Sequence, residues 1–267
     1  MTDPESTSLD VHSLDAGYGK NGTVIRGVSV NAGPGTVTTL IGPNGCGKST
    51  LLKTMARLIT PTRGWVRLRG EDLHAMSNRR AAQLISLLPQ SPSAPPGLTV
   101  GELVARGRHP YRSRWRGLSE TDREVVDRAM NLTCVRDLSE KDIGSLSGGQ
   151  RQRAWIAMTL AQDTPFLLLD EPTTYLDPAH AVEVLQLARH LAVEEGRTVV
   201  LVLHDLNLAA RFSDNVVLMK DGRCMVSGPP HESIRAETLR GAYALDADVI
   251  SDPSDGTPLV IARGRVS

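Results

Sequence analysis

The chain has 267 residues, enough for one large or two small domains with a substantial core. Its 30 basic and 30 acidic side chains give a formal net charge of zero, which argues against a globally basic nucleic-acid-binding protein, although local patches stay possible. The polar, acidic N-terminus is not expected to be a signal peptide, and no apolar run approaches the roughly 18 residues of a membrane span. The three scattered cysteines fit reduced thiols in a cytosolic protein.

The first part of the chain is predicted to form strands. We expect residues 1–8 to be a disordered tail. Between Leu9 and Leu40, short β-prone runs alternate with Gly, Asn and Pro turns, which predicts an antiparallel sheet layer. Tyr18 lies between glycines and is expected to be exposed, where its ring could stack on a nucleobase or simply pack a turn. The later run GWVRLRG predicts an edge strand.

The segment LIGPNGCGKST, residues 40–50, fits the phosphate-binding loop pattern G-x-x-x-x-G-K-[ST]. Glycines let the backbone bend around phosphates, and the N–H groups of a helix N-terminus favour an anion. Lys48 would reach the β- and γ-phosphates, and the Ser49 hydroxyl would ligate Mg²⁺. A chance glycine-rich turn is the alternative, which the apolar strand expected at Val37–Ile41 and the helical run behind the loop disfavour. The candidate nucleotide contacts here are Gly42, Pro43, Asn44, Gly45, Cys46, Gly47, Lys48, Ser49 and Thr50.

Cys46 lies inside this loop at the start of the expected helix. Helix N-termini favour the thiolate over the thiol, so we expect Cys46 to react with a maleimide faster than Cys134 or Cys224. The alternative is a small apolar residue whose sulfur is turned inward and is inert.

A helical insert is predicted after the lone amide of Gln90 and the loop SPSAPPG. TVGE (99–102) reads as a capping box, and SETD (119–122) resembles a second helix start, so residues 98–145 should be mostly helical. The segment RGRHPYRSRWR is basic and contains no acid. A solvated basic loop is favoured over a partner-docking surface, and the arginines concerned are Arg106, Arg108, Arg112, Arg114 and Arg116.

A second candidate anion site opens the next helix, where two glycines in SLSGGQR would present backbone N–H groups beside a serine hydroxyl. Its residues are Ser147, Gly148, Gly149 and Gln150. Along the helix that follows, small and apolar residues recur with the spacing i, i+3, i+4 and i+7, which predicts one narrow buried face. These residues are Ala154, Ala157, Met158 and Ala161.

Two fully apolar strands are expected to end in chemistry-bearing residues. Phe166–Leu169 runs into Asp170 and Glu171, and buried carboxylates are costly unless they bind a cation or exchange protons. The alternative is a core strand that merely ends in acids. The second strand, residues 198–203, ends at His204, a candidate γ-phosphate contact at the same sheet edge, although a lone histidine is usually structural.

Between and after these strands the sequence predicts a helix over residues 179–195, a hairpin over 216–226, and a small helical and β tail whose last strand is GTPLVIARG.

These motifs, in this order, make the chain resemble the ATP-binding cassette (ABC) ATPases over essentially its full length. The resemblance implies an α/β fold with a RecA-like parallel-sheet core, an N-terminal antiparallel β layer and a helical subdomain. It implies a single ABC ATPase domain, with the core and β layer in 9–97 and 146–230, the helical subdomain in 98–145 and a small C-terminal extension in 231–267. Residues 42–50 match the Walker A loop, and the other motif positions are Tyr18 (adenine stacking), Gln90 (Q-loop), Leu146–Gln150 (signature), Leu167–Glu171 (Walker B), Asp177 (D-loop) and His204 (switch histidine).

Within that family the chain looks like the ATPase of a bacterial ferric-siderophore importer. The segments that carry this likeness are LTVGELVARGRHPYR, SLSGGQRQRAWIAMTLAQDTPFLLLDEPTTYLD, HDLNLAARFSD and DVISDPSDGTPLVI. Haem and cobalamin importers share much of HDLNLAA and are the alternatives. PAHAVEV after Asp177 departs from the aliphatic-His-Gln common in relatives. A non-transport cassette ATPase, such as a translation factor or a DNA-repair ATPase, is disfavoured because the chain has one cassette, no sustained heptads and no CxxC.

The resemblance also implies a mechanism, with ATP and Mg²⁺ as cofactors. Two copies would meet head to tail, each Walker A loop facing the partner's signature. Ser49 would ligate Mg²⁺ directly, Asp170 largely through water, and Gln90 would sense the metal. Glu171 would be the general base and His204 would contact the γ-phosphate. The implied partners are a second copy, transmembrane permease subunits and, indirectly, a substrate-binding lipoprotein, at the cytoplasmic face of the membrane and without nucleic acid.

Overall fold

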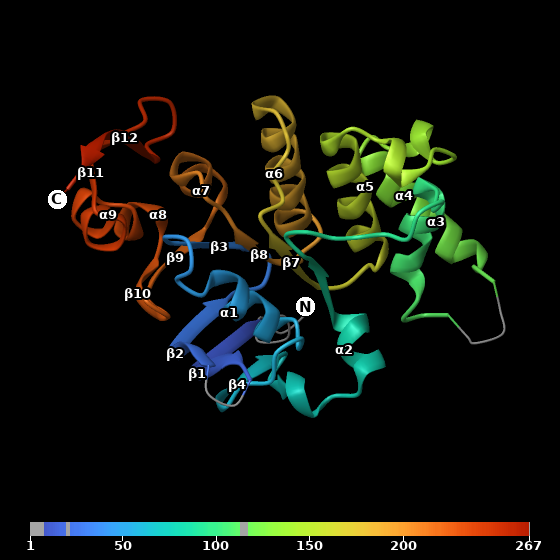
Figure 1. The fold of residues 1–267 in the computed structure, drawn as a ribbon, viewed down its shortest axis with the longest axis horizontal. Helices are drawn as coiled ribbons and strands as arrows, with labels where there is room; N and C mark the ends of the chain where they lie inside the picture. The colour runs from blue at the N-terminus through green and yellow to red at the C-terminus, as the bar shows by residue number, and fades with distance from the viewer. Residues whose placement is uncertain (1–7, 20–21, 113–116, 267) are drawn as a thin grey trace. The chain divides into compact units, whose positions relative to one another are not determined.

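The computed structural model describes residues 8–19, 22–112 and 117–266 (Figure 1). They form two compact units, one from residues 8–76 and 188–266 and the other from residues 77–187. Residues 1–7 of the expected tail over 1–8 and the arginines Arg114 and Arg116 lie outside the described residues. The predicted division at residues 97, 145 and 230 stays a prediction beside these observed units.

An antiparallel sheet forms the first layer of the first unit. Its strands follow the order β2-β1-β4-β5 and are β1 (Leu9–Tyr18), β2 (Gly22–Ala32), β4 (Arg63–Leu68) and β5 (Glu71–Asp72). The predicted β layer is therefore present. The expectation that GWVRLRG is an edge strand is wrong, because the two-residue strand β5 pairs with the outer side of β4.

A mostly parallel sheet forms the core of the first unit. In the order β10-β9-β3-β8, its strands are β3 (Val37–Ile41), β8 (Thr198–Val202), β9 (Asn215–Lys220) and β10 (Arg223–Gly228). Every residue of β3 and β8 is buried, as expected for strands covered on both faces. Residues 37–40, which lie in the stretch predicted to form the antiparallel layer, thus belong to this sheet instead. The helix α1 (Lys48–Met55) follows β3 directly after the glycine-rich loop.

The last residues add a small extension to the same unit. Its elements, with the helix that precedes the β9–β10 hairpin, are α7 (Leu206–Phe212), α8 (Pro230–Ser233), α9 (Ala236–Tyr243), β11 (Leu245–Ser251) and β12 (Pro258–Arg265). The buried Ser233 hydroxyl is hydrogen-bonded to the carbonyl oxygens of Val216 at 3.0 Å and Gly228 at 3.1 Å, which attaches α8 to the core sheet. Figure 1 shows α7 and α9 beside the β11–β12 hairpin.

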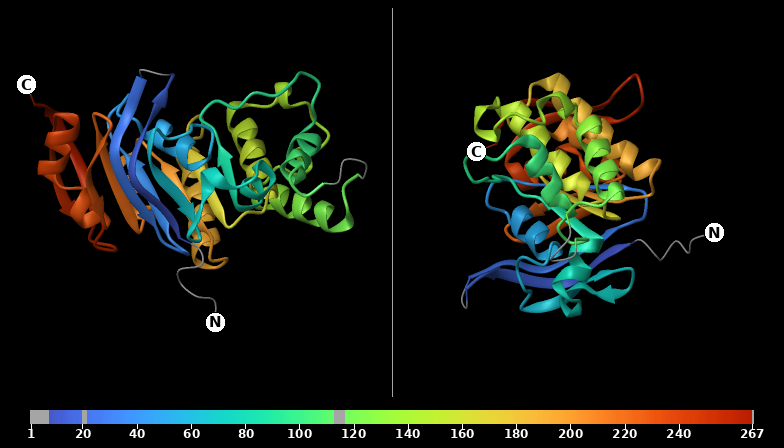
Figure 2. Two further views of the ribbon diagram at one scale, coloured as in Figure 1. Left: turned by 90° about the horizontal axis from the view of Figure 1, so that it is seen from below. Right: turned by 90° about the vertical axis from the view of Figure 1, so that its right-hand side faces the viewer.

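The second unit is mainly helical (Figure 2). Its elements are α2 (Asn78–Leu84), β6 (Ile85–Leu88), α3 (Val100–Ala105), α4 (Glu120–Leu132), α5 (Gly148–Ala161), β7 (Phe166–Asp170) and the start of α6 (Pro178–Val193). The two strands pair in parallel, and α3, α4 and α5 pack on one another. Both predicted capping boxes are confirmed, at Thr99 before α3 and at Ser119 before α4.

Two expectations about this unit are wrong. The helix α5 is buried on most of its surface and not on one narrow face, because α3, α4 and β6 all pack against it. The segment from Arg106 is also not simply a solvated basic loop. Arg108 is buried, its Nε atom is 2.8 Å from Asp122 Oδ1, and its guanidinium lies over the ring of Tyr111.

Among the described residues, no helix combines the length and the apolar character that crossing a membrane would require.

Candidate functional site

The glycine-rich loop between β3 and α1 has the backbone of a phosphate-binding loop. Gly42, Gly45 and Gly47 all have positive φ angles, of 146°, 80° and 104°. A Cβ atom at Gly42 would lie 2.3 Å from the carbonyl oxygen of Met219, and one at Gly47 would lie 2.6 Å from Ile25 Cγ2. These positions therefore require glycine. The residue before α1, Gly47, has no side chain to cap the helix, and a helix N-terminus of this kind favours a bound anion.

Lys48 is held inside this loop. Its side chain is only 6% exposed, and Nζ donates to the carbonyl oxygens of Gly42 at 2.6 Å and Pro43 at 3.1 Å. The loop is held from outside as well, because Gly222 N donates to Cys46 O at 3.1 Å. The sequence predicted the hairpin over residues 216–226, to whose turn Gly222 belongs, but no local signal indicated that this turn supports the loop.

Cys46 does not have the environment of a reactive thiolate. Its side chain is 3% exposed, and burial raises the pKa of its thiol, with only partial compensation from the nearby Lys48 ammonium. The expected preference for the thiolate is therefore wrong. The desolvation of the sulfur outweighs the favourable charge.

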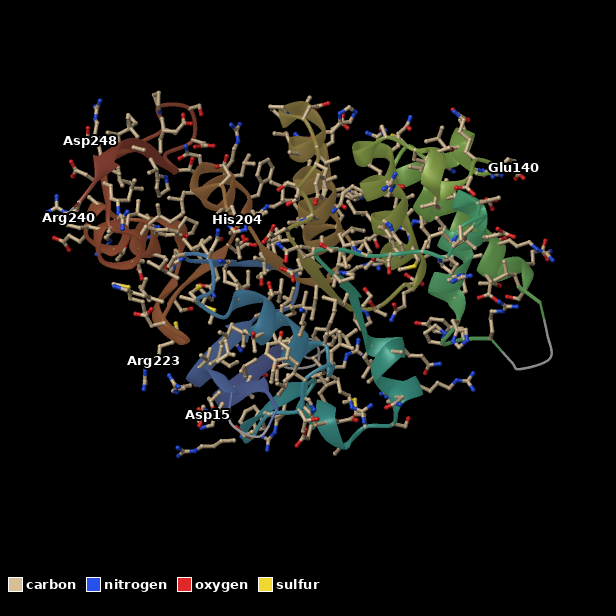
Figure 3. All side chains as sticks on the ribbon, viewed as in Figure 1. Asp15, Glu140, His204, Arg223, Arg240 and Asp248 are labelled. Atoms are coloured by element: carbon tan, nitrogen blue, oxygen red, sulfur yellow. The ribbon has the colours of Figure 1, made fainter. Side chains whose placement is uncertain are left out.

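The switch histidine candidate and the loop share one edge of the core sheet. The strand β8, which leads to His204, runs parallel to β3, and Leu203 N donates to Leu40 O at 3.3 Å. His204 is exposed directly before α7, where Figure 3 labels it. Asp205 caps that helix, since its Oδ1 atom accepts from Asn207 N and Leu208 N, both at 2.9 Å.

Tyr18 stands at the end of β1 with 55% of its surface exposed, as expected from its flanking glycines. An exposed ring of this kind can stack on a nucleobase. Adenine stacking by Tyr18 stays a prediction.

The second unit brings Gln90 and Glu171 together. The strands β6 and β7 are parallel with Leu88 opposite Leu169, so the residues two positions further on meet beyond their carboxyl ends. Gln90 Nε2 donates to Glu171 Oε1 at 2.8 Å, and the hydroxyl of Thr174 donates to Glu171 Oε2 at 3.3 Å. Nothing in the sequence pattern singled out Thr174.

Both acids at the end of β7, Asp170 as its last residue and Glu171 directly after it, are desolvated. Asp170 is 1% exposed and Glu171 is 9% exposed. Glu171 also has a φ angle of 54°, a strained conformation for a residue other than glycine. Strain of this kind persists where the surroundings determine the conformation, and it clusters at functional sites. The buried pair is thus a candidate site for cation binding or proton transfer.

The start of α5 forms the second candidate anion site. Ser147 and Gln150 make a reciprocal capping box, in which the Ser147 hydroxyl accepts from Gln150 N and the Gln150 side chain accepts from Ser147 N, both at 3.2 Å. Gly148 and Gly149 lie beside the chain before α6. A Cβ atom at Gly148 would be 3.5 Å from Tyr175 Cβ, an ordinary van der Waals contact.

A pocket of about 240 Å³ joins this helix start to the segment after β6. Gln90, Gly148 and Tyr175 all line it, so the Q-loop and signature candidates lie side by side within this unit.

Asp177 is engaged by its own helix. Its two carboxylate oxygens contact His180, one accepting from the backbone N–H at 3.0 Å and the other lying 2.7 Å from Nδ1. The backbone hydrogen bond, followed by the side-chain contact, lowers the pKa of the Asp177 carboxyl. His180 belongs to the PAHAVEV segment that departs from the expected pattern.

The donor set suits Mg²⁺ chemically. Ser49, Gln90 and Asp170 offer hydroxyl, amide and carboxylate oxygens, which are the ligands that Mg²⁺ prefers. Because the Gln90 NH₂ group is directed to Glu171, its amide oxygen is free to face a different partner. Within the described residues, no three His, Cys, Asp or Glu side chains gather into a metal cluster of their own.

Comparison with known proteins gives a consistent result. The family model described as ABC transporter matches residues 25–174. The chain is 45% identical over 259 residues to a siderophore transport system ATP-binding protein of Bacillus subtilis, covering 97% of this chain and 94% of that one. It is 46% identical over 257 residues to the ferric enterobactin transport ATP-binding protein of Escherichia coli, covering 95% and 93%. A cobalamin import ATP-binding protein of Halobacterium salinarum is 43% identical over 254 residues, covering 95% of this chain and 63% of that one.

Solved structures agree. A metal-chelate type ABC transporter in an inward-facing conformation superposes with a TM-score of 0.83 at 25% identity, covering 97% of this chain and 98% of that chain. The dimeric structure of the bacterial ABC transporter cassette MJ0796 gives a TM-score of 0.74 at 27% identity, covering 83% and 98%.

Proposed function

This chain belongs to the ABC transporter family of ATP-hydrolysing proteins, and we propose that it energises the import of ferric siderophores into a bacterial cell. The assignment of the cargo rests on the 45% identity to a siderophore transport ATP-binding protein across 97% of this chain. That likeness extends beyond the family model's residues 25–174 and therefore includes the C-terminal extension.

Nucleotide binding rests on the phosphate loop of the first unit. The loop N–H groups and the N-terminus of α1 would bind the phosphates. The Lys48 ammonium, which now donates to the loop carbonyls of Gly42 and Pro43, would turn to the β- and γ-phosphate oxygens. The exposed ring of Tyr18 would cover the adenine.

Hydrolysis rests on Glu171. As general base it accepts a proton from the attacking water, whose oxygen bonds to the γ-phosphorus while the bond to the β–γ bridging oxygen breaks, releasing ADP and phosphate. The hydrogen bonds from Gln90 and Thr174 hold the two oxygens of the carboxylate, so the base is oriented before ATP arrives. His204 contacts the γ-phosphate.

Ser49, Gln90 and Asp170 would hold Mg²⁺, which when bound neutralises charge on the phosphates. The oxygen donors of these side chains and the burial of Asp170 support this assignment.

Two copies would act together as a head-to-tail dimer. The N-terminus of α5, with Ser147, Gly148, Gly149 and Gln150, would bind the γ-phosphate held by the partner copy, and Asp177 would contact that copy's phosphate loop. The dimeric cassette structure supports this arrangement. A helix start opened by two glycines is also suited to bind an anion from outside the chain.

The dimer would sit at the cytoplasmic face of the membrane on transmembrane permease subunits, and a substrate-binding lipoprotein would deliver the cargo to them. The importer names of the relatives support these partners.

The cargo is tested by purifying the tagged chain from its own cells under mild detergent. We expect a permease to copurify, and the binding protein encoded beside that permease to bind a ferric siderophore in a tryptophan-fluorescence titration. Haem and cobalamin are titrated in parallel. A binding protein that takes either of them and no siderophore would contradict the cargo, and copurification with ribosomes or DNA would contradict transport.

A further inference from the structure

The first turn of α7 is joined to the C-terminal hairpin by one side chain. Asn207 Oδ1 accepts from Val260 N at 2.7 Å, and Asn207 Nδ2 donates to Val260 O at 3.3 Å. Val260 lies opposite Val249 in the β11–β12 ladder. Because both backbone groups of Val260 face Asn207, they point away from β11. The amide of Asn207 therefore takes the place that a neighbouring strand would occupy at this one residue.

Arg211 lies on the same face of α7, four residues after Asn207 and one helical turn further on. Its positive charge contributes to the lowered pKa of both Asp252 and Asp255 in the β11–β12 loop, after the larger effect of hydrogen bonds inside that loop.

The hairpin is itself fastened to the rest of the unit. Arg263 pairs with Asp248 across the two strands at 2.8 Å, and Arg240 of α9 pairs with Asp246 of β11 at 3.1 Å. Figure 3 labels Asp248 and Arg240. These exposed ion pairs are weak supports. The firmer anchor is the buried Ser233, which is bonded to β9 and to the end of β10. The extension therefore connects the core sheet at one end with α7 at the other.

We propose that Asn207 is a positioning residue for ATP hydrolysis, through which the C-terminal extension holds the loop that carries His204. The inference rests on the proposed function, in which His204 contacts the γ-phosphate. Leu203 is fixed to β3 on one side of this histidine, and the Asp205 cap begins α7 on the other. The place of His204 therefore depends on where the first turn of α7 lies, and Asn207 ties that turn to β12.

This contact also unites two segments that the cassette motifs leave unexplained. HDLNLAARFSD supplies Asn207 and Arg211, and DVISDPSDGTPLVI supplies the loop acids and Val260. In the structure, the hydrogen bonds between Asn207 and Val260 join these two segments.

The test compares Asn207→Ala with Asn131→Ala in the complex with the permease. Asn131 is an exposed asparagine on α4 in the other unit, so its substitution removes a helical amide without touching this contact. We expect Asn207→Ala to lower kcat by roughly three- to tenfold, in keeping with two lost hydrogen bonds. KM for ATP should change by less than about twofold, since the loop that binds the phosphates is intact. Asn131→Ala should match the wild type.

A backbone pair tests the same contact from the hairpin side. Val260→Pro removes the N–H that Asn207 accepts, on a face of β12 turned away from β11, where proline is tolerated. Ala262→Pro places the same ring two residues further along the strand. Only Val260→Pro should reproduce the loss of kcat. The assays are run well below the melting temperatures of both proline variants. Equal losses in the two proline variants would show general damage to the hairpin and would overturn the proposal.

A double-mutant cycle with His204→Ala separates the positioning role from a purely structural one. If Asn207 acts through His204, Asn207→Ala should cost no further activity in the His204→Ala background. The same fold-loss in both backgrounds would overturn the inference. The inference would also be overturned if His204→Ala hydrolysed ATP slowly while Asn207→Ala hydrolysed it at the wild-type rate. Wild-type turnover in His204→Ala would instead contradict the role of His204 in the proposed function.

Discussion

Replacing Asp122 by asparagine should destabilise the helical unit measurably. One carboxylate oxygen accepts from Arg108 Nε at 2.8 Å, and the other accepts from the Ser119 hydroxyl at 2.7 Å and the Ser119 N–H at 3.0 Å. The Ser119 hydroxyl and Arg108 outweigh the opposing effect of burial and lower the pKa of Asp122 from 3.8 to about 2. At about 1.4 kcal/mol for each tenfold change in proton affinity, that difference corresponds to roughly 2 kcal/mol.

The sign of this contribution determines its pH dependence. The carboxyl is more acidic in the folded state, so its stabilisation is complete above about pH 5 and is lost as the pH falls through about 2. Asp122→Asn should therefore lower the free energy of unfolding by about 2 kcal/mol at both pH 7 and pH 5.5. Urea denaturation, followed by the fluorescence of Trp155, which is buried in α5, measures this free energy of unfolding.

Glu102→Gln is the matched control. Glu102 occupies the same capping-box position in the first turn of α3, but on the surface. Glu102→Gln should lower the free energy of unfolding by less than Asp122→Asn does. In a protein that already carries Arg108→Met, Asp122→Asn should also lower this free energy by less than it does in the wild type, because the two substitutions remove one shared interaction. Equal losses for Asp122→Asn and Glu102→Gln, with full additivity to Arg108→Met, would refute the reasoning.

Three further predictions concern the nucleotide site. Glu171→Gln should bind ATP, lose on the order of 10²–10⁴ in hydrolysis rate and elute as an ATP-dependent dimer in size-exclusion chromatography; turnover at the wild-type rate would mean that another residue is the base. Lys48→Ala should abolish nucleotide binding, whereas Ser147→Arg should leave binding to the monomer intact and block hydrolysis; fluorescent-ATP titration distinguishes them, and equal loss of binding would argue against the head-to-tail dimer. Maleimide should label the exposed Cys134 before the buried Cys46, whose thiol pKa is raised, and mass spectrometry showing faster labelling at Cys46 would contradict this order.

The sequence predicted the structure best where a pattern of residues is compatible with only one local structure. The glycines of the loop, the apolar runs of β3, β7 and β8, and the capping boxes were all predictable, because phosphate loops, buried strands and helix starts demand particular residue types. The meeting of Gln90 with Glu171 is a direct consequence of two parallel strands ending together.

The misplaced predictions all depend on contacts distant in sequence. Whether a five-residue apolar strand joins a parallel or an antiparallel sheet is decided by its neighbours, and for β3 these are β8 and β9, about 160 residues or more away. The burial around α5 comes from α3, α4 and β6, and the acid that pairs with Arg108 lies 14 residues further along the chain. The environment of Cys46 was misjudged because its helix position was visible in the sequence and its burial was not.

ATP-driven iron uptake tests the central claim most directly. The permease and this chain are reconstituted in proteoliposomes with ATP and Mg²⁺ inside, and the binding protein carrying a ⁵⁵Fe-labelled siderophore is added outside. The wild-type complex should accumulate ⁵⁵Fe with ATP and not with ADP, and Glu171→Gln should stop accumulation. Undiminished uptake in Glu171→Gln, or wild-type ATP hydrolysis without any iron uptake, would contradict the account.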